Sequence, residues 1–243
     1  MITAIKSELR KVLTVRSTYL VFIIALLINM IVSFWTSGYR VDHALDTHYL
    51  QNSIIALISG IGFFVGITPL LLVTHEYRHN LIYYTLTANH SRTIVFLAKL
   101  AVIAKYALVF MLANMLFATL AILVGLNLGD HTLPAQQFEW WPLLWRSGFY
   151  LLAVSFMAAI FGFVVRNQIG AFVVYLLYPG TVEALIGLLI KKNAGYLPFR
   201  AIATVIMPAQ GDFSVNKSAV IAAVWVVVGL IVSWLLFLKR DAN

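Results

Sequence analysis

The chain has 243 residues, of which 62% are hydrophobic and only 11% are charged, and its formal net charge is +8. Soluble domains carry about 25% charged residues, so this composition excludes an ordinary soluble protein and indicates an integral membrane protein. Cysteine is absent, which excludes disulfides, thiolate metal sites and cysteine nucleophiles.

The first seventeen residues have an amphipathic pattern. One helical face would hold Ile2, Ile5, Leu9, Val12 and Leu13, and the other would hold Lys6, Arg10 and Lys11. This pattern predicts an interfacial helix over residues 1–17 that lies on the inner membrane surface. The alternative is a solvated start to the first span, with charges that only anchor it.

Six apolar runs are long enough to cross the roughly 30 Å hydrocarbon core of a bilayer. They cover residues 19–36, 54–74, 106–126, 143–165, 170–190 and 219–238. We predict an all-α integral membrane protein with six transmembrane helices, forming a single transmembrane domain over residues 1–243. Gly62 and Gly66 form a G-x-x-x-G pattern in the second run, which is typical either of a dimer face or of close packing within one subunit.

A polar stretch follows the second run, and the third apolar run is unusually long. Residues 93–126 would form a helix about 50 Å long, more than a bilayer needs. Lys99 and Lys105 therefore indicate that this helix extends into the cytoplasm. Residues 75–105 are expected to form a helical hairpin or a short transverse helix on the inner side.

The fifth run is interrupted by Pro179 and Gly180 and contains Glu183. A carboxylate inside the membrane is a functional candidate because its burial is costly. Alternatively, Glu183 lies near an outer vestibule and pairs with Arg146, Arg200 or a lysine. The loop at 191–217 contains an apolar segment too short to cross the membrane, which predicts a re-entrant or interfacial segment.

Basic residues are concentrated on one side of this topology. The segments on the side of the N-terminus hold eleven Lys and Arg residues against three Asp and Glu, whereas the other segments hold six of each. Lys and Arg are retained on the cytoplasmic side, so we predict a multi-pass protein of the cell (inner) membrane with both termini cytoplasmic. The lipid bilayer explains the net charge, and no nucleic-acid partner is expected.

The sequence HEYRH matches the H-E-x-x-H zinc pattern, in which His75 and His79 would bind the metal and Glu76 would act as the general base. No third ligand stands in a recognisable motif, and Arg78 would place a cation beside the metal. Two surface histidines at a helix end are therefore the favoured interpretation, without a metal site. A membrane zinc metalloprotease is kept as the alternative function.

The order of several short motifs along the chain forms a further pattern. ELRK and RS precede the first span, and Glu76 at the inner end of the second span is followed by Leu86, Arg92 and Lys99-Leu100. This order resembles the permease subunits of ATP-binding cassette transporters of the type-2 membrane family. That family usually has E-x-x-x-G-T, then P-x-x-R and K-L; here Asn80 replaces the glycine and Asn89 the proline.

The resemblance implies a permease subunit, here an exporter, that couples ATP hydrolysis by a separate ATPase to movement of a substrate. A cytoplasmic coupling helix between spans 2 and 3 would contact that ATPase through Glu76, Tyr77, Arg78, Leu86 and Arg92. A re-entrant segment between spans 5 and 6 is also implied. The permease would not be an enzyme, would hold no cofactor, and would work as a homodimer with two ATPase subunits that bind ATP and Mg.

Polar and aromatic side chains within the spans are the candidates for a substrate pathway. From depth alone these are Asn29, Asn114, Tyr175, Tyr178 and Glu183. Glu76 is also expected to pair with Arg78 or with a basic residue of the N-terminal helix. A membrane assembly or immunity subunit without a motor is the third function that the sequence leaves open.

Overall fold

A computed structural model of the chain is helical throughout the part that it describes, which covers residues 2–14, 16–38, 47–78, 91–129, 139–208 and 213–239. No strand occurs among these residues. The helices before residue 130 are α1 (Ile2–Thr14), α2 (Arg16–Gly38), α3 (Thr47–Val65), α4 (Ile67–Arg78) and α6 (Arg92–Leu128). The later ones are α7 (Trp140–Val165), α8 (Gln168–Leu177), η1 (Tyr178–Val182), α9 (Glu183–Ile190), η2 (Lys191–Tyr196), α10 (Pro198–Ile206) and α11 (Val215–Lys239).

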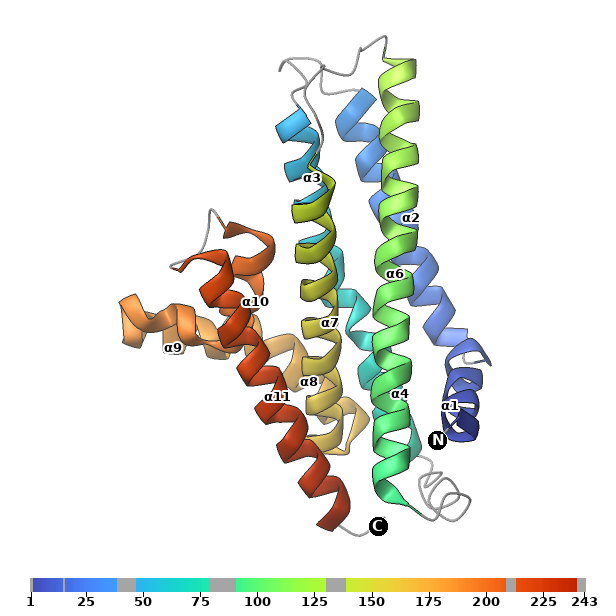
Figure 1. The fold of residues 1–243 in the computed structure, drawn as a ribbon, viewed down its shortest axis with the longest axis vertical. Helices are drawn as coiled ribbons and strands as arrows, with labels where there is room; N and C mark the ends of the chain where they lie inside the picture. Colours follow the sequence, from blue (N-terminus) through green and yellow to red (C-terminus); the bar gives the residue numbers. More distant parts are fainter. Residues whose placement is uncertain are drawn as a thin grey trace.

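The long helices form a bundle along one axis (Figure 1). α2, α6 and α7 follow this axis, α11 lies obliquely beside them, and α1 packs against the lower part of α6. The end of the bundle at which α1 lies is also where α6 begins and α11 ends. This end is called the α1 end below.

Six helical segments are long and apolar enough to cross a membrane, which confirms the predicted number of spans. They are Thr18–Ser37, Ile54–Tyr77, Arg92–Leu128, Trp140–Val165, Gln168–Tyr196 and Val215–Lys239. Large apolar side chains are exposed along their outer faces, for example Ile31, Leu112 and Val220. In a soluble protein such surfaces would promote aggregation, whereas in a bilayer they contact lipid.

The second span is broken after Val65, which the sequence analysis did not predict. Pro69 has no N–H to donate, and its ring crowds the carbonyl four residues before it, which is that of Val65. α3 therefore ends at Val65 and α4 begins at Ile67. The break places Gly66 against Tyr175 of α8, where a Cβ atom would collide with the phenol oxygen.

The glycines of the G-x-x-x-G pattern pack within the chain. Gly62 faces Tyr150 and Leu151 of α7, and Gly66 also contacts Ala158 of the same helix. Of the two alternatives, the described contacts favour close packing inside one subunit.

The fifth span is interrupted at the predicted Pro179-Gly180 step. α8 passes into the π-helical turn η1, and α9 then points sideways from the bundle (Figure 1). Sharp kinks in helices occur at prolines and at π turns, and both are present here. α10, which follows η2, packs against α11 and α7.

Candidate functional site: a buried ion cluster at the α1 end

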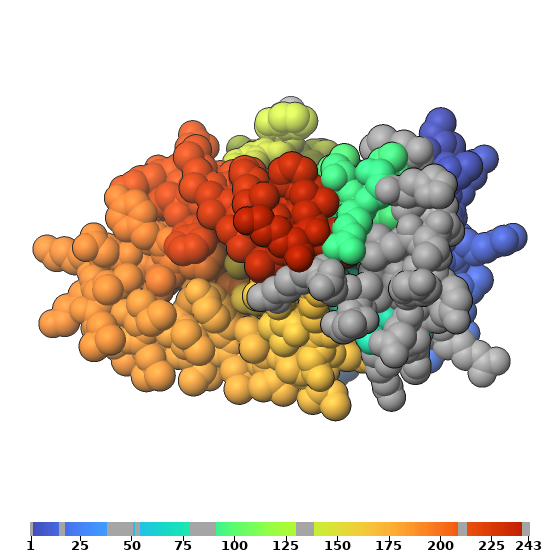
Figure 2. Space-filling view, turned by 90° about the horizontal axis from the view of Figure 1, so that it is seen from below, coloured from blue at the N-terminus to red at the C-terminus, as the bar shows by residue number. Residues whose placement is uncertain are grey.

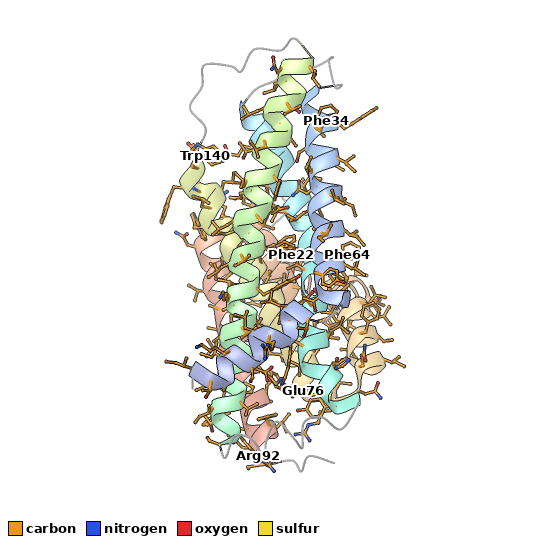
Figure 3. The ribbon with its side chains drawn as sticks, turned by 90° about the vertical axis from the view of Figure 1, so that its right-hand side faces the viewer. Phe22, Phe34, Phe64, Glu76, Arg92 and Trp140 are labelled. Atoms are coloured by element: carbon orange, nitrogen blue, oxygen red, sulfur yellow. The ribbon has the colours of Figure 1, made fainter. Side chains whose placement is uncertain are left out.

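Four charged side chains meet where α1 packs against the bundle. Lys99 Nζ lies 2.9 Å from Glu8 Oε2 and 2.8 Å from Glu76 Oε1. Lys11 Nζ lies 2.6 Å from Glu8 Oε1 and also pairs with Glu76 Oε1. These four residues are called the ion cluster below. Figure 3 shows Glu76 beside α1, near the same end as Arg92.

The ion cluster is electrically balanced and largely withdrawn from solvent. The side chains of Lys99, Glu8 and Glu76 are 1%, 2% and 4% exposed, whereas that of Lys11 is 36% exposed. Isolated buried charges cost several kcal/mol each, so they persist where opposite charges and hydrogen bonds compensate them. Two ammonium groups alternating with two carboxylates balance the charge, although Glu76 Oε2 is buried without a hydrogen-bond partner among the described residues.

The helical period of α1 explains why Glu8 faces inward. Ala4, Glu8 and Val12 are spaced by four residues and form the buried face of the helix. Ala4 keeps the approach to the bundle short, while Lys6 and Arg10 remain exposed. The predicted helix is thus confirmed as Ile2–Thr14, but the residues turned toward the protein include an acid that the apolar pattern did not reveal.

Two arginines connect this end of the bundle to the last helix. Arg92 Nη1 donates to the carbonyl oxygen of Leu238 at 3.0 Å, and Arg166 Nη2 donates to that of Leu236 at 3.3 Å. The terminal carbonyls of a helix lack partners within it and carry partial negative charge, so cations stabilise them. Figure 2 shows the start of α6 in green beside the end of α11 in red.

Arg166 also links α4 to this contact. Its guanidinium lies 5.2 Å from the ring centroid of Tyr77, in a cation–π arrangement. Arg166 ends α7 in a left-handed conformation with φ of 57°, and Asn167 then caps α8 by accepting from the N–H of Gly170 at 2.9 Å. A tight turn between two spans thereby presents an arginine to both neighbours.

The residues predicted for ATPase coupling are distributed around this site. Glu76 belongs to the ion cluster and pairs with Lys11. This agrees with one of its two expected pairings, that with a basic residue of the N-terminal helix. Tyr77 and Arg92 both connect to α11, the former through Arg166. Arg78 ends α4, and Leu86 lies outside the described residues.

Glu8 and Lys99 are the cluster residues that sequence reasoning missed. Lys99 was expected in a cytoplasmic extension of α6, but α1 covers this part of the helix and Lys99 is buried. The signal was available, because a lysine among the apolar residues Val95, Phe96 and Val102 requires an acidic partner. Lys105 is exposed, as expected for a lysine at the end of the apolar run.

Two of the predicted pathway residues form a polar contact between α2 and α6. Asn29 Nδ2 donates to Asn114 Oδ1 at 2.7 Å, and Ser33 Oγ donates to Asn29 Oδ1 at 2.9 Å. All three side chains are buried. Amide hydrogen bonds of this kind hold membrane helices together, so the pair has a structural role whether or not a substrate passes near it.

Tyr175 packs against the break in the second span. Its hydroxyl donates to the carbonyl oxygen of Phe63 at 2.7 Å, and its ring stacks on that of Phe63 at 4.5 Å between centroids. The side chain is fully buried. It therefore supports the chain on the α3 side of the kink.

Glu183 binds the start of α10. Its Oε1 accepts from the N–H of Phe199 at 2.7 Å and its Oε2 from that of Arg200 at 2.9 Å. A carboxylate at a helix N-terminus satisfies free N–H groups and complements the helix dipole. Glu183 also lines an open cavity of about 740 Å³ with Lys191 and Arg200, and Tyr178 lies nearby against Phe199.

The structure describes only part of the H-E-x-x-H motif on which the zinc alternative rests. His75 is half-buried, while His79 lies outside the described residues. Oε1 of Glu76, the expected base, already accepts from Lys11 and Lys99. Within the described ranges, no three His, Asp or Glu side chains are grouped as metal ligands would be.

The fold and these contacts define the class of the protein: it is a multi-pass membrane protein with a charged, buried junction at one end. Comparison with known proteins adds no family to this description. No protein-family model matches the chain, and no curated protein matches it.

Proposed function

We propose that the chain is the permease subunit of an ATP-binding cassette exporter, in which a separate ATPase drives substrate across the membrane. The observation that carries this proposal is the ion cluster, since it joins α1, α4 and α6 at one end of the bundle. The order of motifs that resembles the type-2 permeases supports the same function.

A permease driven by a separate motor needs a contact surface that is mechanically connected to several spans. The connecting segment at 79–90 would provide this surface, and one residue near each of its ends is held. On one side, Glu76 binds Lys11 and Lys99, and on the other side Arg92 binds the last turn of α11. A displacement at this end would therefore reach α1, α6 and α11 together.

The same proposal fixes the composition of the complex. The α1 end would be cytoplasmic, because it carries the excess of Lys and Arg. Two copies of the chain would assemble with two ATPase subunits, which bind ATP and Mg. The chain contains no G-x-x-x-x-G-K-[ST] motif, so the nucleotide would be bound by the partner. The pathway would involve Asn29, Asn114 and the region around Glu183.

The absence of cysteine permits a direct test. Leu86→Cys would carry the only thiol of the chain, and a thiol-reactive photo-cross-linker placed there in native membranes should capture a P-loop ATPase. The ATPase activity of the purified complex should fall in Glu76→Gln and in Arg92→Gln. Lys217→Gln at the start of α11, away from the α1 end, is the matched control.

Two results would reject this function. The first is unchanged ATPase activity and transport in Glu76→Gln, which would remove its role in coupling. The second is stoichiometric zinc in the purified chain that disappears in His79→Ala, because that would favour the metalloprotease.

A further inference from the structure

A groove lies at the junction of α1 with the first and third spans. Its volume is about 350 Å³, and it lies between Val12 and Leu13 of α1, Tyr19 and Phe22 of α2, and Lys105 and Val109 of α6. Apart from Lys105, these side chains offer hydrocarbon or aromatic surface. None of the four ion-cluster residues lines the groove, although Val12 lies on the same face of α1 as Glu8.

The groove opens on the outer surface of the bundle. Leu13, Tyr19 and Val109 line it and are 69%, 43% and 47% exposed. These helices are flanked by apolar surface of the kind that contacts lipid. An apolar groove in this position is accessible from the bilayer, so its occupant should be a lipid chain.

The length of α6 is expected to place Lys105 at the depth of the phospholipid headgroups. α6 contains 37 residues, about 55 Å of helix, whereas the hydrocarbon core is about 30 Å thick. The uncharged part of α6 begins directly after Lys105, which places the ammonium group at the boundary between hydrocarbon and headgroups. Tyr19 lies across the groove, and tyrosine is enriched at this boundary.

The charge of Lys105 is not balanced by the described part of the protein. The acids of α1 and α4 are bound by Lys11 and Lys99 in the ion cluster. Lys105 is exposed and forms no ion pair with any acidic side chain that the structure describes. Lys6 and Arg10 of α1, which do not line the groove, are exposed as well.

We propose that the groove between α1, α2 and α6 binds one acyl chain of an anionic phospholipid whose headgroup phosphate contacts the Lys105 ammonium. The apolar walls accept the chain, and the lysine selects the headgroup charge. α1 would then be held both by the ion cluster and by a lipid. This site does not depend on whether the protein transports anything.

Native mass spectrometry of the purified chain tests the proposal. The protein is equilibrated with equal amounts of phosphatidylglycerol and phosphatidylcholine that carry the same acyl chains, and the retained lipids are counted. We expect phosphatidylglycerol to be retained preferentially. Lys105→Gln should reduce this preference about fivefold, since a lysine near the surface contributes about that factor to anionic-lipid binding.

Two further variants separate the headgroup contact from the acyl-chain contact. Lys105→Arg should keep the preference because it keeps the charge, whereas Val109→Phe should fill the groove and lower the retention of both lipids. Lys6→Gln removes an exposed lysine of α1 outside the groove and should leave both unchanged. Thermal unfolding of each variant confirms that it is folded.

Three outcomes would overturn the proposal. Equal retention of the two lipids by the parent chain would exclude selection of charge. Equal losses in Lys105→Gln and Lys6→Gln would show a diffuse surface effect in place of a site. Spontaneous disulfide formation between two copies of Val109→Cys would show that a second chain covers the groove.

Discussion

Replacing Lys99 by methionine should release α1 from the bundle. The Lys99 side chain is 1% exposed and binds both Glu8 and Glu76. Methionine fills a similar volume without charge or hydrogen-bond donors. The two buried carboxylates would then share only Lys11, which is partly exposed to solvent.

The size of this effect follows from the cost of an uncompensated buried charge. Removing one partner of a buried ion pair typically costs 3–5 kcal/mol. Hydration of the freed carboxylates offsets part of this cost, so we expect about 3 kcal/mol. Since about 1.4 kcal/mol corresponds to a factor of ten, the detached form of α1 should become roughly a hundredfold more populated.

A single cysteine makes this population measurable. Ala4 lies on the buried face of α1 and is 3% exposed, so Ala4→Cys reacts with a maleimide mainly when α1 detaches. The labelling rate should rise about a hundredfold when Lys99→Met is added. Lys6→Met, which removes an exposed lysine of the same helix, should change it by less than a factor of about three.

A charge-balanced variant provides the second control. Glu8→Gln combined with Lys99→Met leaves one acid and one base in the ion cluster, and it should cost about 1–3 kcal/mol less than the sum of the single changes. Equal labelling rates in Lys99→Met and Lys6→Met would refute the reasoning, because α1 would then be held by its apolar contacts alone.

Three further predictions concern other parts of the chain. Gly66→Ala places a methyl group against the buried side chain of Tyr175 and should lower the free energy of unfolding by about 1–3 kcal/mol. Gly60→Ala meets no atom within 4 Å and should be neutral or stabilising. Thermal unfolding compares the two variants, and equal Tm values would contradict the packing. Glu183→Gln removes the charge at the start of α10 and should lower the free energy of unfolding by about 1 kcal/mol, which corresponds to a fall in Tm of roughly 2–4 °C. An unchanged Tm would mean that the charge at the cap is dispensable. Thr14→Cys and Glu139→Cys should react with a membrane-impermeant maleimide from opposite sides, the former only in inverted vesicles; labelling of both from one side would contradict the topology.

The spans could be predicted from the sequence because a bilayer imposes one simple requirement over about twenty residues. The fifth run was predicted over residues 170–190, whereas its helical segment spans Gln168–Tyr196; its break was visible from the Pro179-Gly180 step. The break in the second span was missed although Pro69 is visible, since proline is tolerated in membrane helices when neighbouring groups satisfy the freed carbonyls. Tyr175, more than a hundred residues later, packs at this break and donates to the carbonyl of Phe63, and no local pattern indicates this contact.

Only part of the ion cluster could be predicted from the sequence, for a similar reason. Glu76 stood out at the end of an apolar run, and its pairing with the N-terminal helix was one of two expectations. Lys99 was assigned to a cytoplasmic extension of the helix because the third apolar run is longer than a bilayer needs. Its burial depends on α1 folding back over α6, which is a tertiary contact between residues 91 positions apart.

The arrangement of the ion cluster also argues for a definite position of α1. Apolar contacts allow one helix to slide along another with little change in buried area, because they have no preferred partner atoms. A shift of α1 by one helical turn, about 5.4 Å, would break both contacts that α1 makes across the cluster, Lys99 with Glu8 and Lys11 with Glu76, and would leave only Lys11–Glu8 within α1 and Lys99–Glu76 between α6 and α4. α1 is therefore held in one register, as a polar residue fixes the register of a coiled coil. A part that transmits displacement between a cytoplasmic motor and a membrane bundle needs this property, since a helix that slid freely would absorb the movement in place of passing it on.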